Sequence, residues 1–266
     1  MVGAVELDNV TGAELRAAVR NGYTGLTSGL ANGYAQANVV ILPADFADDF
    51  AAYCRANPDA CPLITQTAPG DPEVRDLAPG SDLRTDVPRY RVFRDGVASR
   101  EEPTEIGDLW RDDMVAFLIG CSFTFERTLR EAGLRIRHID LGRNVPMFRT
   151  NIESVAAGPF AGAVVVTMRP FPAGEVERVV EITKAFGDMH GAPLHIGDPE
   201  AIGITDLAHP DFGDGVPVED GETPMFWACG LTAQVALAAA RPALAITHSP
   251  GRLFVTDLSD VPGEQA

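Results

Sequence analysis

Short runs of apolar and β-branched residues recur along the chain and alternate with segments that carry the helical period. Residues 38–42 and 163–168 are the clearest of these runs. Short apolar runs between turn signals are typical of buried strands, whereas apolar residues three and four positions apart indicate amphipathic helices. Because both patterns occur from one end of the chain to the other, the sequence predicts an α/β or α+β fold.

The expected elements follow from these patterns and from the residues that cap helices and form turns. The expected strands are residues 38–42, 62–67, 90–97 as a hairpin, 134–139, 163–168, 224–228, 243–248 and 253–256, and the expected helices are residues 11–20, 45–55, 112–132, 175–186 and 231–240. No linker composition and no internal repeat stands out. We therefore expect a mixed β-sheet flanked by helices, in a single compact unit over residues 1–266.

Three segments allow more specific expectations. Thr11 and Glu14 have the spacing of a capping box at the start of the first helix. Residues 68–87 are rich in Pro, Gly and Asp and are expected to form a surface loop. The longest helical pattern, residues 112–132, places Val115, Leu118 and Leu129 on one face.

The charge of the chain limits its partners. Its formal net charge is −17, and Lys184 is its only lysine. Nucleic acids and anionic lipid surfaces are bound by clustered cations, so neither is an expected partner. A small anionic amino-acid or hydroxy-acid substrate is compatible with this charge, because a few arginines can line a pocket inside an acidic exterior.

The sequence favours a cytoplasmic protein. No apolar run is long enough to span a bilayer, and residues 1–30 lack a basic start followed by an apolar stretch. The four cysteines form no CxxC pair, which fits reduced thiols better than a disulfide framework. Assembly into a homo-oligomer is left open.

Several common enzyme classes lack local support. The chain contains neither the G-x-G-x-x-G nor the G-x-x-x-x-G-K-[ST] phosphate-binding loop. It also lacks the G-x-S-x-G nucleophile elbow and the H-E-x-x-H zinc motif.

The densest polar constellation is residues 190–199. His190, His195 and Asp198 stand there among glycines and prolines. Proline prevents a regular helix, so a fixed loop directs these side chains. Histidine is the usual general acid or base near neutral pH. The same three residues could instead bind a divalent metal, although their spacing matches no standard zinc motif. Structural and solvent-exposed histidines are the alternative.

Several residues could bind a substrate carboxylate. Arg169 follows a buried strand, where ligands of α/β folds commonly bind, and a guanidinium can hold a carboxylate with two hydrogen bonds. Arg143 and Asn144 share a polar loop, and Ser122 follows Gly120 in a segment of small residues. A strand-end arginine reaching solvent, ordinary turn chemistry and a core helix with small packing residues are the respective alternatives.

The C-terminal third adds further candidates. Glu222 precedes an apolar run that ends at Cys229, where the start of a helix could lower the pKa of the thiol; a buried, inert cysteine is the alternative. His248 stands at the end of another expected strand, and Asp214 lies in the loop between these elements and residue 198.

Taken together, these segments resemble the D-glutamate cyclase family, whose members are also catalogued as hydro-lyases. The resemblance rests on the ordered motifs QANVVILP, DACPL, GCSFTFE, RNVPM, MRP, HGAPLHIGDP, PDFGDG, GETPMFWACG, THSPG and VTD, from about Gly25 to Asp257. It implies conversion of D-glutamate to 5-oxo-D-proline and water. The positions to which it points are Arg169, His190, His195, Asp198, Asp214, Glu222, Cys229 and His248.

The chemistry of this reaction suggests roles for those positions. The α-amine must lose a proton and attack the side-chain carboxyl carbon, and the leaving oxygen must depart as water. We expect Arg169, helped by Arg143, to hold a carboxylate, and His190 and His195 to serve as base and acid. Asp198 or Asp214 would orient a histidine, and Ser122 and Asn144 would donate hydrogen bonds. No cofactor is predicted, although a divalent metal could replace the polarising arginine.

Two other functions fit the same residues. A hydro-lyase acting on a small hydroxy acid also needs a base, an acid and a cationic clamp. A non-catalytic binding or accessory protein for small acids would bind without turnover.

Overall fold

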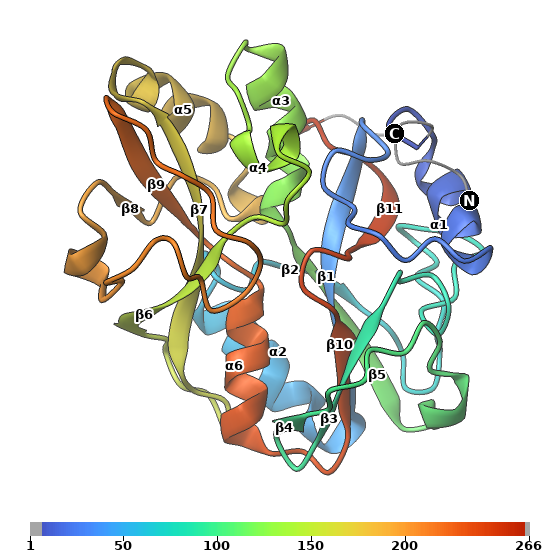
Figure 1. Cartoon of the computed structure of the whole chain (residues 1–266). Helices are drawn as coiled ribbons and strands as arrows, with labels where there is room; N and C mark the ends of the chain where they lie inside the picture. The colour runs from blue at the N-terminus through green and yellow to red at the C-terminus, as the bar shows by residue number, and fades with distance from the viewer. Residues whose placement is uncertain (1–6, 264–266) are drawn as a thin grey trace.

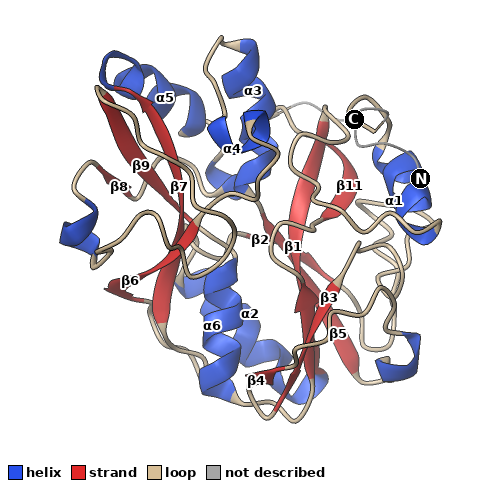
Figure 2. Cartoon of the chain, viewed as in Figure 1, coloured by secondary structure: helices blue, strands red, loops and turns tan. Residues whose placement is uncertain are grey.

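The computed structural model describes residues 7–263 and contains two antiparallel sheets (Figure 1; Figure 2). Residues 1–6 and 264–266 lie outside the described part. The expectations of a single unit over residues 1–266 and of an N-terminus without a signal sequence rest partly on these residues. The larger sheet has the order β2-β5-β1-β10-β3-β4, and β11 also pairs with β1. Its strands are β1 (Tyr34–Pro43), β2 (Leu63–Gln66), β3 (Tyr90–Arg94), β4 (Val97–Ala98), β5 (Met114–Gly120), β10 (Ala245–His248) and β11 (Phe254–Ser259).

The smaller sheet has the order β6-β7-β9-β8. Its strands are β6 (Met147–Glu153), β7 (Ala163–Pro172), β8 (His195–Ile196) and β9 (Glu222–Ala228). The α-helices are α1 (Gly12–Arg20), α2 (Ala47–Ala56), α3 (Glu126–Glu131), α4 (Arg137–Asp140), α5 (Val176–Thr183) and α6 (Leu231–Ala240). Each strand pair between described residues is antiparallel, so α+β is the class that the structure selects from the two predicted. The expected combination of sheets and flanking helices is confirmed.

Helices α2 and α6 lie between the two sheets (Figure 1). One apolar core joins them, because Phe50 of α2 and Leu237 of α6 belong to the same buried cluster as Phe117 of β5 and Phe226 of β9. None of the helices within residues 7–263 combines the length and the apolar character that a membrane span requires.

The chain folds as two topological repeats. The first repeat comprises β1, α2, β2, β5 and α3, and the second comprises β7, α5, β8, β9 and α6. Their strand orders, β2-β5-β1 and β8-β9-β7, are equivalent. A proline ends the first strand of each repeat, and each opposes the first residue of the third strand: Pro43 faces Met114, and Pro172 faces Glu222.

The repeats also exchange strands. Strand β6, which follows the first repeat, pairs with β7 of the second, and β10, which follows the second repeat, pairs with β1 of the first. The sequence shows no repeated residues, and the repeat of the fold lies in strand order and register rather than in residue identity.

Two expected elements in the middle of the chain were also wrong. Residues 112–132 contain β5, a 3₁₀ turn at Ser122–Phe125 and the short α3, not one long helix. All seven residues of β5 are buried, and a strand covered on both faces is a continuous apolar run that a helical pattern also fits. Residues 134–139, expected as a strand, lead into α4.

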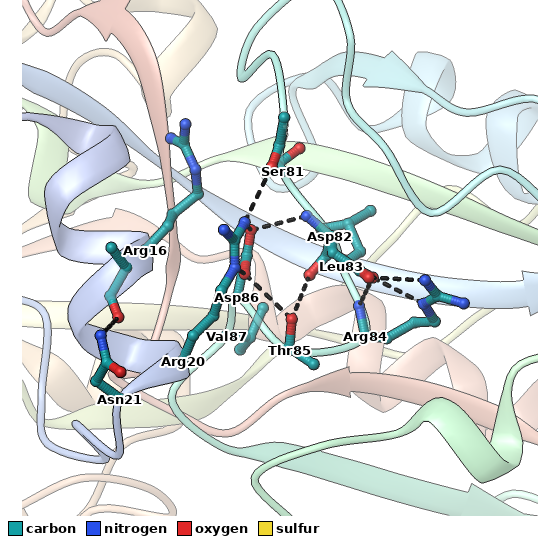
Figure 3. Close-up of polar contacts among 12 residues, drawn as sticks. Arg16, Arg20, Asn21, Ser81, Asp82, Leu83, Arg84, Thr85, Asp86 and Val87 are labelled. Atoms are coloured by element: carbon teal, nitrogen blue, oxygen red, sulfur yellow. Dashed lines mark hydrogen bonds and ion pairs between the residues drawn. The ribbon is translucent and has the colours of Figure 1, made fainter.

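Residues 68–87 lack helices and strands, as expected, but they are not merely a surface loop. Val74, Leu83 and Val87 are buried against the larger sheet. Polar contacts fix this loop (Figure 3): Arg20 of α1 donates to the carboxylate of Asp86, which also accepts from the Asp82 N–H at 2.7 Å. The loop therefore covers a sheet face, and α1 anchors it. The capping box expected for α1 is present.

The packing of α2 gives a stability prediction. The ring of Phe50 is fully buried and lies 4.8 Å from that of Phe117 and 5.1 Å from that of Phe160, centroid to centroid. We expect Phe50→Ala to lower the free energy of unfolding by about 3–5 kcal/mol, because it leaves a cavity at the centre of the core. Chemical denaturation measures the change. The control Val97→Ala, at a 70% exposed position, should change it by less than about 0.5 kcal/mol; equal effects would contradict this description of the core.

Candidate functional site

A small buried cavity lies where the two repeats meet. Its volume is about 20 Å³, which is room for about one water molecule, so a larger ligand requires the lining side chains to move. Its polar and thiol-bearing lining residues are Asn38, Cys121, Ser122, Thr167, His190, Cys229 and His248. Its apolar lining residues are Phe123, Val145, Met147, Leu231 and Leu253, with Gly251 between them in space. Four predicted site residues, Ser122, His190, Cys229 and His248, therefore share one cavity.

Close backbone packing places His190 there. A Cβ at Gly120, the last residue of β5, would lie only 2.0 Å from the carbonyl oxygen of Asp188. Glycine is therefore required for the loop that carries His190 to pack against the strand. His190 itself has a left-handed backbone with φ of 76°. Such a conformation in a residue other than glycine costs about 1–3 kcal/mol and often occurs at functional sites.

His190 is held as a neutral base. Burial lowers the pKa of His190 to about 4, although the carbonyl groups of Asp59 and Gly120 favour the protonated form. Its Nδ1 lies 2.7 Å from the Asp59 carbonyl oxygen. A carbonyl oxygen only accepts hydrogen bonds, so Nδ1 carries the hydrogen and Nε2 keeps its lone pair.

His248 is held in the opposite tautomer. Burial lowers the pKa of His248 to about 4 as well. Its Nδ1 lies 3.1 Å from the backbone nitrogen of Val39 and 3.4 Å from the Val39 carbonyl oxygen. The shorter contact makes Nδ1 the acceptor, so Nε2 is assigned the hydrogen of the neutral ring. The cavity is thus lined by one imidazole whose Nε2 can accept a proton and one whose Nε2–H can donate a hydrogen bond.

Arg169 lies beneath the cavity in a buried ion pair. Its guanidinium donates to the Glu126 carboxylate, with Nε at 3.0 Å from Oε1, and both side chains are almost fully buried. Burial alone would raise the pKa of Glu126, but His138 and Arg169 lower it to about 2. Arg169 also lies over the rings of Phe125 and Trp227. The structure therefore gives Arg169 a protein carboxylate as its partner.

Arg169 also orients two hydroxyl groups of the cavity wall. Its Nη2 donates to Ser122 Oγ, and its Nη1 donates to Thr167 Oγ1, each at 3.0 Å. A hydroxyl that accepts a hydrogen bond from a guanidinium still has its own O–H to donate. Ser122 and Thr167 are therefore poised to present O–H donors to a carboxyl group in the cavity.

The other expected residues of the central loop lie away from the cavity. His195 is half-buried in β8, and its Nε2 donates to the Asp198 carbonyl oxygen at 2.6 Å. The Asp198 side chain accepts the Glu200 N–H at 3.0 Å. Glu222 forms two hydrogen bonds with Arg137, which hold its pKa below the usual range although burial opposes this.

Asn144 and Asp214 belong to the wall behind the cavity. The Asp214 carboxylate accepts the Asn144 N–H at 2.8 Å, and the Asn144 amide donates to the Pro250 carbonyl oxygen at 3.2 Å. Asn144 packs directly against Gly251, a lining residue. Arg143 donates to the Gly215 carbonyl oxygen and lines a separate, more open hollow.

The alternative of a metal site needs His190, His195 and Asp198 to lie together, but the structure separates His190 from the other two. His190 lines the cavity, whereas His195 and Asp198 bond to each other through a backbone carbonyl group. Within residues 7–263, no three side chains of His, Cys, Asp or Glu come together in a metal-binding arrangement. The four cysteines are free and buried.

Sequence reasoning did not select Asn38, Thr167 or Cys121 as site residues. Asn38 and Thr167 occupy equivalent places in β1 and β7, each five residues before the terminal proline. Each is a polar residue inside an otherwise apolar, buried strand, and burying a polar group costs free energy unless it is hydrogen-bonded. A single polar residue within an apolar strand is therefore the sequence signal that could have identified both.

The fold and this cavity define an α+β protein built of two intertwined repeats around a buried polar site. The chain belongs to the D-glutamate cyclase family, whose model matches residues 115–257.

Curated relatives match nearly the whole chain. "Putative hydro-lyase" is the name of proteins from Rubrobacter xylanophilus, 57% identical over 93% of this chain and 96% of the relative, and from Stutzerimonas stutzeri, 53% identical over 93% and 94%. A relative of the same description from a Thermoanaerobacter species is 51% identical over 96% of this chain and 97% of its own length. The family and the names of these relatives indicate a lyase.

The buried ion pair gives a second stability prediction. Glu126→Gln keeps the size of the side chain but leaves the Arg169 charge uncompensated. We expect the free energy of unfolding to fall by about 3–5 kcal/mol, as when one partner of a buried pair is removed. The control Glu131→Gln breaks an exposed pair with Arg127 in the same helix and should cost less than about 1 kcal/mol. Similar losses in both variants would contradict the importance of burial.

The two buried histidines give a prediction for pH. Their folded-state pKa is about 4, against an ordinary value of 6.5, so the unfolded chain binds more protons between these values. Stability should therefore be complete above about pH 6.5 and fall as the pH decreases toward 4, by about 3 kcal/mol per histidine. The free energy of unfolding is measured with urea at several pH values in this range, and its dependence on pH should be weaker in His190→Asn and His248→Asn than in the parent protein. The control His209→Asn, at an exposed position, should show the pH dependence of the parent. An unchanged pH dependence in the first two variants would refute the interpretation.

Proposed function

We propose that the cavity converts D-glutamate to 5-oxo-D-proline and water. The observation that carries the proposal is the pairing of two neutral, buried histidines of opposite tautomer in the lining of one cavity. Family membership supports the choice of substrate. The reaction consists of proton transfers around one new C–N bond and one broken C–O bond.

The proton balance of the reaction matches this pair. The α-ammonium group first loses one proton, and the resulting amine attacks the side-chain carboxyl carbon. The nitrogen then loses a second proton, and the departing oxygen gains two, so that the water carries away as many protons as the nitrogen releases. In our proposal, His190 Nε2 accepts the protons from nitrogen, because it keeps its lone pair at neutral pH. The same group can return them to the leaving oxygen.

Hydrogen-bond donors replace a free cation in substrate recognition. The lining residues include neither arginine nor lysine. The O–H groups of Ser122 and Thr167 and the Nε2–H of His248 can bond to the substrate carboxyl oxygens, where negative charge collects as the amine attacks. Donors fixed before the reaction stabilise such charge without reorganising. Arg169 then acts as a positioning residue that orients two of these donors.

A hydro-lyase acting on a small hydroxy acid is the second candidate, favoured by the names of the relatives. It would use the same groups differently. His190 would take a proton from the carbon beside the carboxyl group, and a donor would release the hydroxyl as water. A non-catalytic binding protein would bind the same acids without turnover.

The direct experiment incubates the purified protein with D-glutamate and L-glutamate separately and follows 5-oxoproline on a chiral column. We expect product from D-glutamate, and we expect His190→Asn to lower kcat by about 10²–10⁴-fold, the usual contribution of a general base. Asparagine tolerates the left-handed backbone at this position. His209→Asn is the matched control, since His209 is exposed and outside the cavity.

Three outcomes discriminate between the candidates. Absence of 5-oxoproline, with a hydroxy acid dehydrated instead, would favour the hydro-lyase. Binding measured by calorimetry without any turnover would favour the binding protein. Full activity of His190→Asn together with loss of activity in His195→Asn would assign the role of general base to His195 instead.

A further inference from the structure

The duplicated fold places a cysteine at the same position in each repeat. Cys121 directly follows Gly120, the last residue of β5, and Cys229 directly follows Ala228, the last residue of β9. The registers are equivalent, because Gly120 pairs with Ala37 of β1 and Ala228 pairs with Val166 of β7. Both thiols line the cavity, and they reach it from the two different sheets.

The two sulfur atoms have matching surroundings. Burial raises the pKa of both thiols, to about 11 for Cys229. The backbone N–H two residues further on, of Phe123 for Cys121 and of Leu231 for Cys229, and the charge of Arg169 lower the pKa of each thiol. The same kinds of group therefore act on both thiols, and the net shift of each pKa is upward.

Such a pair suits proton transfer at carbon. A thiolate formed from a thiol of high pKa is a strong base, and a thiol on another wall of the same cavity can act as the acid. A carbon atom held between them can lose a proton on one face and gain one on the other.

We propose that Cys121 and Cys229 form a two-base pair that inverts the Cα centre of a small α-amino acid held in the cavity, so that the protein also interconverts the enantiomers of its substrate. This inference rests on the proposed function in one respect, namely that the cavity binds glutamate or an acid of the same class.

The step balances without an oxidant or a cofactor. The pair begins with one sulfur as a thiolate, whose proton has passed to solvent, and the other as a thiol. The thiolate removes the Cα proton, and the electron pair of the broken C–H bond stays on carbon, delocalised into the neighbouring carboxyl group. The second thiol gives its proton to the opposite face of the carbon, and that electron pair forms the new C–H bond. The second sulfur is left as a thiolate, so the pair ends with one thiol and one thiolate, as it began.

The experiment incubates the complete protein with D-glutamate in D₂O. Proton NMR follows the Cα–H signal, and chiral chromatography with mass spectrometry follows the L enantiomer and its deuterium content. We expect L-glutamate that carries one solvent deuterium at Cα, while the remaining D-glutamate keeps its hydrogen early in the reaction. Cys121→Ser and Cys229→Ser should each lower the rate of inversion at least about 100-fold.

The matched control is Cys54→Ser, a buried cysteine of α2 that does not line the cavity, and it should invert glutamate at the parent rate. Thermal unfolding of each variant checks that it is folded, and Cys121→Ala and Cys229→Ala replace a serine variant that is not. Deuterium incorporation with retained D configuration would overturn the two-base pair, since it indicates a single base. Inversion that survives in both cysteine variants would also overturn it.

The same samples separate this inference from the proposed function. Formation of 5-oxoproline without Cα exchange in the parent protein would overturn the inference and leave the cyclase reaction in place. Inversion without 5-oxoproline would support the inference and refute the cyclase. Absence of both reactions would overturn both.

Discussion

The buried contact between Arg169 and Glu126 holds the site together. Arg169 belongs to β7 of the smaller sheet, and Glu126 begins α3, which follows β5 of the larger sheet. Two charges removed from water are tolerated only when they are paired and hydrogen-bonded. The same guanidinium donates to the hydroxyl oxygens of Ser122 and Thr167, so the interaction that joins the two repeats also orients two hydroxyl groups of the cavity wall.

The duplicated topology explains where the cavity lies. Each repeat ends its third strand at the junction and begins a helix there, and each sends its next strand into the partner sheet. Equivalent positions therefore line the same cavity: Asn38 and Thr167, and Cys121 and Cys229. Exchanged strands bind each repeat to the other around this cavity. Burial there lowers the pKa of both histidines and leaves them neutral.

The sequence predicted most of the regular structure but not its symmetry. The strands at residues 38–42 and 163–168 were identified because β-branched residues dominate them, and α1 because its capping box is local. Strand β5 was missed because burial on both faces removes the alternation that marks a strand. In the site, His190 was found through the crowding of polar residues around it. Its neighbours His195 and Asp198 lie elsewhere, because nearness within an irregular loop does not determine the direction of a side chain.

The electrostatics of the cavity argue for proton chemistry rather than for charge-driven capture of an anion. Each of its titratable lining groups, His190, His248, Cys121 and Cys229, is shifted by burial toward its neutral form. The one nearby guanidinium is already matched by Glu126. An acidic ligand bound here would therefore meet directed hydrogen-bond donors rather than a free cation. The acidic exterior does not oppose this, because the donors that would hold the substrate are fixed inside the junction of the two repeats.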